Sequence, residues 1–477
     1  MWPDWSGTEY GGMNLSLLEI LALLGAVALV AARWLPAAAR PRVTIAAGAV
    51  FLLSALALCV TGIRWQLLPV VAGGVVAAPL AFLPLVRRRS RWWLALPGSL
   101  FCVCLIATGP VTAWAFPVPV FPTPSGGFAI GTRVLQWTDP DRPETFTADP
   151  RDRRTIVAQL WYPANGPADA PRAQYLGRTE DEARTVSEAL ASGVGLPGFL
   201  FDGVPRARTH AIPDAPVAVE GGRFPVVLFS PGSSGVRTQN TAWAEEIASH
   251  GYVVVALDHP YDSAAVVLAD GRTITSATVS TSDREADDRL ADDWTAIRAA
   301  DLSFALTRLE SLRADPLTGR LDPGRVAVTG HSMGGAAALQ AARRDHRFTA
   351  VINLDGYPRG PLSPMLDQPT LALTQAVTPA TDPRYLPQLT EVLTRGTATN
   401  YRLTIPGAAH LTFTDGPLYL PPVPSIVGSL GRAESPRVVA AASLAFLDSL
   451  LRKGSSDLAG ALSAYGELKV FHPGNGR

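Results

Sequence analysis

A serine set between glycines is the clearest chemical feature of the sequence. Residues 330–334 read Gly-His-Ser-Met-Gly, with Ser332 at the centre. Residues 325–329 (Arg-Val-Ala-Val-Thr) precede the motif and the alanine-rich residues 336–340 follow it, which predicts a strand, a sharp turn and then a helix. Glycines are needed in such a turn because side chains there would collide with neighbouring backbone. The pattern predicts that Ser332 is a nucleophile beside the amides of a helix N-terminus.

A serine hydroxyl is a weak nucleophile and needs a neighbouring base. Two histidines, His346 and His410, follow Ser332 and precede the C-terminal tail. His346 lies in the charged residues 343–347 at the end of the predicted helix, where a solvated side chain is expected. His410 ends a loop of small residues after a predicted strand, where an imidazole can reach the serine. We therefore predict that His410 is the general base.

Two aspartates are candidates for the acid that orients the base. Asp355 ends the predicted strand at residues 349–355 and lies 23 residues after the nucleophile. Asp382 follows the next predicted strand by eight residues, the other position from which folds of this kind supply an acid. Asp355 is the preferred candidate because the carboxyl end of its strand places it at the edge of the sheet where chemistry collects.

Acyl transfer also needs donors for a developing oxyanion, and backbone amides serve because they are fixed before reaction. One is expected from Met333, the residue after the nucleophile. The second is expected from the loop 231–235 (Pro-Gly-Ser-Ser-Gly), from the amide of Ser233. A glycine-rich loop can instead cradle phosphate, but the Gly-Lys-Ser/Thr ending of a P-loop is missing here.

The elements around these residues alternate between strands and amphipathic helices, which predicts an α/β fold with a mainly parallel sheet and helices on both faces. Strands are predicted at residues 155–161, 224–230, 252–257, 325–329, 349–355, 370–374 and 401–405. Helices are predicted at residues 238–250, 283–313, 333–343 and 436–453. Residues 163–222 are predicted to be an excursion with one helix near 180–192, and residues 259–282 a loop.

The first quarter of the chain differs in kind. Apolar runs cover residues 13–32, 43–63, 66–86 and 92–115, each near the ~20 residues that cross a bilayer. We therefore predict a four-helix transmembrane anchor over residues 1–118 and a catalytic domain over residues 119–477. Glu19 is the one acidic residue in these runs, which favours an anchor over a transporter.

The arginines predict how the anchor is oriented, because positive residues are retained on the cytoplasmic side. The first and third loops carry seven arginines, whereas the second carries Arg64 alone. The seven are Arg33, Arg40, Arg42, Arg87, Arg88, Arg89 and Arg91. Both ends, and with them the catalytic domain, are therefore expected outside. The arginine-rich, lysine-poor composition indicates a bacterial genome rich in GC, so the membrane is expected to be the bacterial plasma membrane.

Composition excludes several other functions. The 41 basic and 41 acidic residues balance, which gives no electrostatic reason to expect nucleic acid. The three cysteines, Cys59, Cys102 and Cys104, lie in the apolar runs. Neither a disulfide framework nor a set of metal ligands is therefore expected in the polar part, and we predict no metal and no cofactor.

Together these motifs resemble the plasma-type platelet-activating factor acetylhydrolase family, a lipase-like branch of the α/β-hydrolases. The resemblance spans about residues 119–420 and rests on residues 121–126, 130–131, 229–238, 248–252, 330–335, 347–348, 354–356 and 407–415. It implies the α/β-hydrolase fold, a triad of Ser332, Asp355 and His410, an oxyanion hole from Ser233 and Met333, and independence from metals.

The resemblance implies hydrolysis of short or oxidised acyl groups of glycerophospholipids, as by a 1-alkyl-2-acetylglycerophosphocholine esterase. Pro231 stands where the family often has histidine, and Ser233 and Ser234 replace bulky apolar residues, so the acyl pocket is expected to differ. We expect a serine carboxylesterase or lipase acting on lipid or short-acyl esters. The alternatives are a polyester or dienelactone-type hydrolase, and an inactive membrane-tethered binding module.

Overall fold

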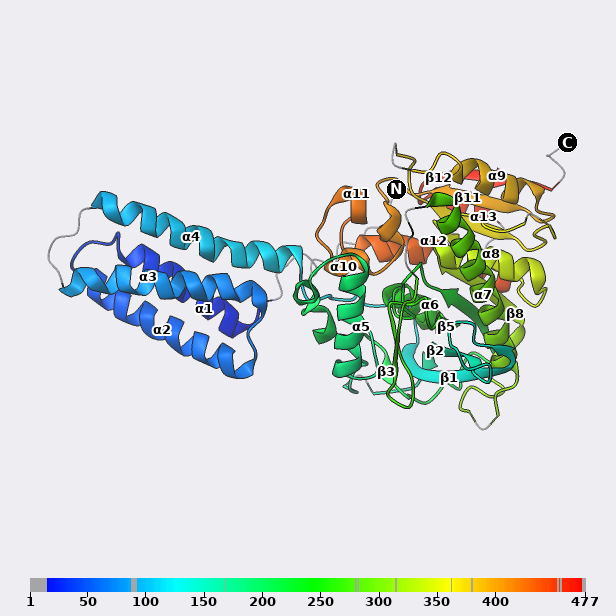
Figure 1. The fold of residues 1–477 in the computed structure, drawn as a ribbon, viewed down its shortest axis with the longest axis horizontal. Helices are drawn as coiled ribbons and strands as arrows, with labels where there is room; N and C mark the ends of the chain where they lie inside the picture. Colours follow the sequence, from blue (N-terminus) through cyan, green and yellow to red (C-terminus); the bar gives the residue numbers. More distant parts are fainter. Residues whose placement is uncertain are drawn as a thin grey trace.

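The computed structural model describes residues 15–86, 92–167, 169–278, 281, 283–313, 315–361, 363–378, 381–452, 454 and 457–473. Residues 87–91, which hold the arginines of the predicted third loop, lie outside the described residues, as do residues 1–14. Four N-terminal helices form an elongated bundle, and the rest of the described chain is built on one large sheet beside it (Figure 1).

The sheet has ten strands in the order β12-β11-β10-β9-β8-β4-β5-β2-β1-β3. Its parallel centre consists of β5 (Val253–Asp258), β4 (Phe224–Ser230), β8 (Leu321–His331), β9 (Ala350–Leu354), β10 (Thr370–Thr374) and β11 (Asn400–Thr404). Antiparallel strands flank this centre: β2 (Arg153–Ala164) and β1 (Ala129–Pro143) on one side, β12 (Glu467–Phe471) on the other. The two-residue β3 (Ile212–Pro213) pairs with β1. The mainly parallel sheet predicted from the sequence is confirmed.

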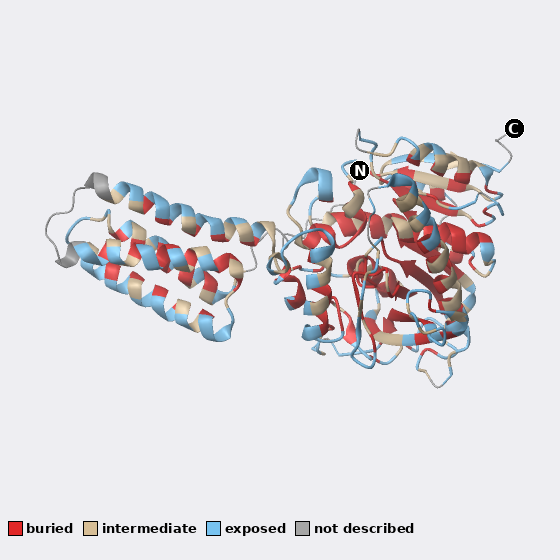
Figure 2. Ribbon diagram, in the orientation of Figure 1, coloured by how far each residue is buried: buried red, intermediate tan, exposed pale blue. Residues whose placement is uncertain are grey.

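Helices cover both faces of the sheet, so the central strands are buried on each side (Figure 2). Along β4, Val227 and Phe229 pack in a core with α6 (Thr241–Ser249) and α12 (Glu434–Leu451). The alternate residues Val226 and Leu228 pack in a second core with α7 (Arg284–Glu310) and α8 (Met333–Arg344). This follows from the two-residue period of a strand, which sends successive side chains to opposite faces. Helices α6, α7, α8 and α12 correspond to the four helices predicted at residues 238–250, 283–313, 333–343 and 436–453, so those predictions are confirmed.

The parallel strands end at one edge of the sheet, which gathers the loops after them. Ser230 pairs with Gly330, and His331 with Leu354, so the ends of β4, β8 and β9 are level. The loops that follow carry the predicted chemistry, as expected for an open parallel sheet.

The sequence prediction missed several elements. Strands β1 and β12 carry exposed polar residues on or near the sheet's margins, so their hydrophobic pattern is weak. Helix α9 (Tyr385–Arg395) has Pro387 near its start, and residues 259–282 contain the hairpin of β6 (Ala265–Val267) and β7 (Thr273–Thr275). Helix α5 (Glu180–Gly193) confirms the helix predicted in the excursion. The remaining short helices are α10 (Gly416–Tyr419), α11 (Pro424–Val427), α13 (Leu458–Ser463) and the 3-10 helices η2 (Gly198–Phe201), η3 (Val204–Arg206) and η4 (His410–Phe413).

The bundle consists of α1 (Leu17–Ala32), α2 (Arg40–Thr61), α3 (Leu68–Val86) and α4 (Trp92–Ala115), with the short helix η1 (Trp65–Leu67) before α3. Three stretches are long and apolar enough to cross a membrane, namely Arg40–Thr61, Trp65–Leu83 and Ala95–Ala115. Helix α1 is apolar but has 16 residues, fewer than the ~20 that span a bilayer. Of the four predicted crossings, three are thus supported by length among the described residues.

A buried ion pair ties two parts of the bundle together. Arg64, just before η1, donates from Nε to Glu19 Oε1 at 2.6 Å and from Nη2 to Oε2 at 2.8 Å. Both side chains are buried. Glu19 also accepts from the backbone of Ser16 and caps α1. The charge of Arg64, in the second loop, and the charge of Glu19, in the first helix, therefore compensate each other inside the bundle.

This geometry predicts how the bundle responds to loss of the pair. Glu19→Ala leaves Arg64 buried without its carboxylate and is expected to destabilise the protein by about 3 kcal/mol. Removing both charges, as Glu19→Leu with Arg64→Leu, is expected to restore most of that loss because no lone charge remains. Thermal unfolding in detergent, followed by circular dichroism, measures both. A double variant that is less stable than either single variant would contradict this account.

Candidate active site

The glycine-flanked serine sits on a strained turn between β8 and α8. Ser332 has φ 54° and ψ −120°, a conformation that costs a non-glycine residue about 1–3 kcal/mol. A Cβ on Gly334 would overlap the Ser230 carbonyl oxygen, and one on Gly330 would overlap the Gly334 carbonyl. The elbow therefore needs both glycines, and it raises the serine above the end of the sheet, as the motif predicts.

His410 and Asp355 lie side by side at the same edge. His410 Nδ1 is 2.7 Å from Asp355 Oδ2. The Asp355 side chain is 1% exposed and that of His410 is 41% exposed. When Nδ1–H donates to the carboxylate, Nε2 of the neutral ring keeps a free lone pair and can accept a proton. This is the arrangement of an acid that orients a base.

Asp355 is held by residues that sequence reasoning missed. Gln375 donates to it from its backbone N–H at 3.1 Å and from Nε2 at 2.9 Å, and the Tyr385 hydroxyl donates at 3.1 Å. Burial next to this carboxylate raises the pKa of the Tyr385 hydroxyl well above its usual range, so the phenol stays a donor. Gln375 and Tyr385 follow β10 without any motif of their own, so no local signal marks them.

The other two candidates from the sequence lie elsewhere. Asp382 binds Arg384 and Arg284, at 2.9 Å and 2.8 Å. Its hydrogen bonds with Arg384 lower the pKa of Asp382 to about 2. His346 is exposed and its ring nitrogen lies 3.9 Å from Asp367. The described contacts of Asp382 and His346 do not include His410 or Ser332.

The loop after β4 passes directly beside the elbow. A Cβ on Gly232 would lie 3.5 Å from the Cβ of Ser332, so this backbone runs about one carbon atom's width away from the serine. The next residue, Ser233, is exposed. Met333 is the first residue of α8, and its N–H has no acceptor within the helix. The two predicted amide donors thus lie on backbone segments that border Ser332.

His331 links these loops and was not singled out by the sequence, although it lies inside the motif. It is buried, and burial lowers its pKa well below the usual range, so the ring is neutral. Nε2–H donates to the His410 carbonyl at 3.0 Å, and Nδ1 accepts from Gln239 Nε2 at 2.9 Å. Gln239 Oε1 accepts from the Gly232 N–H at 3.1 Å. One chain of hydrogen bonds therefore joins the His410 loop, the elbow and the loop after β4.

Within the described part of the chain, His, Cys, Asp and Glu side chains form no group of three or more that could hold a metal ion. What the residues at this edge offer is a hydroxyl on a strained elbow, an oriented imidazole and nearby backbone amides. That set is suited to nucleophilic acyl transfer.

Two of the similar proteins each match part of this chain. A probable 1-alkyl-2-acetylglycerophosphocholine esterase of Arthroderma benhamiae is 28% identical over 280 residues, covering 55% of this chain and 65% of that protein. The platelet-activating factor acetylhydrolase of Cavia porcellus is 31% identical over 156 residues, covering 28% of this chain and 35% of that protein. The chain therefore spans less than two thirds of the length of these relatives.

A solved structure supports the fold over a longer stretch. The ferulic acid esterase from Streptomyces cinnamoneus is similar with a TM-score of 0.60 and 30% identity, covering 73% of this chain and 98% of that one. Together with the strand order, this likeness confirms the predicted α/β-hydrolase fold. Residues 118–460 match the family described as platelet-activating factor acetylhydrolase, isoform II, a range that contains the elbow, Asp355 and His410. The chain belongs to the platelet-activating factor acetylhydrolase isoform II family.

Proposed function

We propose that this protein is a serine-dependent carboxylic ester hydrolase that works through Ser332, His410 and Asp355. The observation that carries the proposal is the 2.7 Å contact between His410 Nδ1 and the buried Asp355 carboxylate, beside a serine on a positive-φ elbow. Membership of the family and the likeness to several esterases support the same activity.

The reaction begins when His410 Nε2 removes the Ser332 proton and the serine oxygen attacks the ester carbonyl. The N–H groups of Ser233 and Met333 donate to the oxyanion of the tetrahedral intermediate. His410 then gives its proton to the leaving alcohol, which leaves an acyl group on Ser332. Water, deprotonated by His410, hydrolyses this acyl-enzyme by the reverse sequence. Asp355 keeps the imidazole in the correct tautomer and stabilises its protonated form.

The proposed substrates are lipid or short-acyl esters, with glycerophospholipids as the leading class. Support comes from relatives named as a 1-alkyl-2-acetylglycerophosphocholine esterase and a platelet-activating factor acetylhydrolase. A second candidate, a polyester or dienelactone-type hydrolase, is favoured by a likeness to cutinase est1 of Thermobifida alba. That protein is 28% identical over 170 residues, covering 36% of this chain and 44% of that one.

The proposal extends to the N-terminal quarter. Residues 1–118 are the membrane anchor and residues 119–477 the catalytic domain, which lies on the extracytoplasmic side of a bacterial plasma membrane. The bundle supports this, because large apolar side chains such as Leu53, Val60 and Leu100 are exposed. Figure 2 shows exposed positions along the helices of the bundle. The arginine bias of the loops supports the orientation.

The roles of the two aspartates can be separated by substitution. Asp355→Asn keeps the shape of the side chain but removes the charge that orients His410, so kcat is expected to fall about 10⁴-fold. Asp382→Asn is the matched control and should leave kcat within about twofold, because Asp382 pairs with Arg284 and Arg384 near the surface and not with His410. Ser332→Ala should be at least as damaging as Asp355→Asn, and combining the two should add little. If Asp382→Asn loses most of its kcat while Asp355→Asn keeps its kcat, the acid is Asp382 and the assignment is wrong.

The activity itself is tested with purified full-length protein in detergent. A fluorophosphonate is expected to label Ser332 covalently, and short-acyl phospholipids are expected to be cleaved faster than polyester oligomers of matched acyl length. Labelling that persists in Ser332→Ala would contradict the assigned nucleophile. An unlabelled, inactive but folded protein would instead support a binding module.

The orientation is tested by reporters that work on one side of the membrane only. Alkaline phosphatase fused after Ser125 is expected to be active, and green fluorescent protein at the same position is expected to be dark. A fusion after Arg40 should give the opposite pattern, since that loop is predicted to be cytoplasmic. A fluorescent fusion after Ser125 would overturn the topology.

A further inference from the structure

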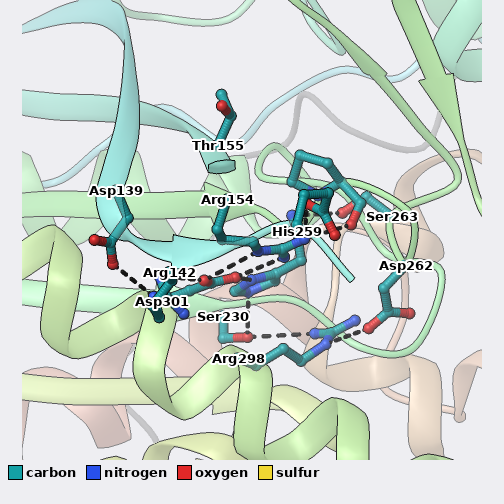
Figure 3. Close-up of polar contacts among 12 residues, drawn as sticks. Asp139, Arg142, Arg154, Thr155, Ser230, His259, Asp262, Ser263, Arg298 and Asp301 are labelled. Atoms are coloured by element: carbon teal, nitrogen blue, oxygen red, sulfur yellow. Dashed lines mark hydrogen bonds and ion pairs between the residues drawn. The ribbon is translucent and has the colours of Figure 1, made fainter. Parts of the chain in front are cut away.

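A buried arginine forms hydrogen bonds with the loop that carries the Ser233 amide. Arg298 lies on α7 and is 0% exposed. Its Nη1 donates to the Pro231 carbonyl at 2.5 Å, and its Nη2 donates to the Gly232 carbonyl at 2.9 Å. Its Nε donates to Asp262 Oδ2 at 2.5 Å (Figure 3). The planar guanidinium thus holds two successive carbonyls and one carboxylate at once, a geometry that lysine cannot reproduce.

The hydrogen bonds from Arg298 to these two carbonyls also fix the direction of the N–H groups on the same peptides. In a trans peptide the C=O and N–H point in opposite directions, and both peptides here are trans. The Pro231 carbonyl points at Arg298, and the Gly232 N–H on the same peptide donates the other way, to Gln239. By the same rule, the Gly232 carbonyl, which accepts from Arg298, directs the Ser233 N–H away from the guanidinium, in a loop that passes close to Ser332 at Gly232.

The next peptide is held as well. Gly232 O also accepts from the Gly235 N–H at 2.9 Å, which closes a turn over residues 232–235. Ser234 adopts φ 54° in this turn, a conformation that is unfavourable for a side-chain-bearing residue. Asp262 Oδ1 accepts from the Ser234 N–H at 3.4 Å, while its other oxygen binds Arg298. Arg298 and Asp262 therefore hold the peptides on both sides of Ser233.

Arg298 is itself fixed from behind by polar side chains (Figure 3). Its Nη1 also lies 3.3 Å from Ser230 Oγ, which is 2.9 Å from His259 Nε2. His259 Nδ1 lies 2.8 Å from Asp301 Oδ2. Burial lowers the pKa of His259 to about 4, so the neutral ring donates to Asp301 and accepts from Ser230, whose oxygen then accepts from Arg298. Each hydrogen bond has a donor and an acceptor, and the order of the network is defined.

We propose that Arg298, held by Asp262, is a positioning residue that presets the Ser233 amide as an oxyanion donor. The inference rests on the proposed function, because an oxyanion forms only if Ser332 attacks an acyl group. The physical effect is preorganisation. The peptide that carries the Ser233 N–H is already oriented before substrate binds, so reorienting it adds nothing to the free energy of the transition state.

The test compares Arg298→Lys with a matched control, Arg237→Lys. Arg237 is 1% exposed and also bridges two carboxylates, Asp258 and Glu182, but its described side-chain bonds include no carbonyl of residues 231–233. With a short-acyl ester and full-length protein, Arg298→Lys is expected to lower kcat about 100-fold with KM within about threefold, as for loss of an oxyanion donor. Affinity for a trifluoromethyl ketone, which forms a tetrahedral adduct with a serine, should fall in parallel. Arg237→Lys should lower the melting temperature without this loss of kcat.

A second variant covers the case in which Arg298→Lys does not fold. Asp262→Asn keeps an oxygen for the Ser234 N–H but weakens the hold on Arg298, so a fall in kcat of about 10-fold without a change in KM is expected. If the folded Arg298 or Asp262 variants keep full kcat, or lose activity through KM alone, the inference is wrong. Ser332→Ala in the same assay distinguishes failure of the proposed function from failure of the positioning role. If Ser332→Ala stays active, the proposed function fails, whereas an inactive Ser332→Ala beside a fully active Arg298→Lys overturns the positioning role alone.

Discussion

The close approach of two backbone segments at the centre of the sheet is the constraint on which the candidate site depends. The elbow around Ser332 packs so tightly against the end of β4 that Gly330 and Gly334 leave no room for a Cβ beside the Ser230 carbonyl. The strain of the positive φ at Ser332 is supported by this packing and by the bond from the Ser332 N–H to the Leu354 carbonyl, at 2.9 Å. The same contact brings the loop after β4 close to Ser332, so the proposed nucleophile lies near the proposed amide donors.

Charges buried around this centre are compensated in a consistent way. Asp355 accepts from Gln375, Tyr385 and His410, and Arg298 faces Asp262 and two carbonyls. A buried charge without such partners would cost several kcal/mol, so these networks allow only a few arrangements of the loops that they connect. The rigidity this provides matters more for orienting groups than for net stability, because desolvation offsets much of the attraction in each pair.

The helical bundle and the α/β unit meet through contacts of several kinds. Arg432 donates to the Trp114 carbonyl at 2.6 Å, the rings of Trp65 and Phe199 meet edge to face at 5.2 Å, and Phe116 packs against the buried apolar residues around Tyr175. Arg432 and Phe199 belong to segments far apart in the sequence. Arg432 thus holds the end of α4 and Phe199 contacts η1, so the α/β unit binds two elements of the bundle that lies beside it (Figure 1).

The sequence by itself determined the elements whose signals are local. The Gly-His-Ser-Met-Gly motif, with a strand before it and a helix after it, predicted the elbow, and the α/β pattern predicted the parallel sheet, because backbone sterics and side-chain periodicity act over a few residues. Tertiary structure decided what depends on distant partners. The residues alone favoured Asp355 without excluding Asp382, and the fold sets Asp355 against His410, 55 positions away, while Asp382 pairs with arginines. Glu19 with Arg64, and Arg298 with the loop after β4, are likewise joined only when separate elements pack, since an ion pair or hydrogen bond carries no periodic signature along the chain.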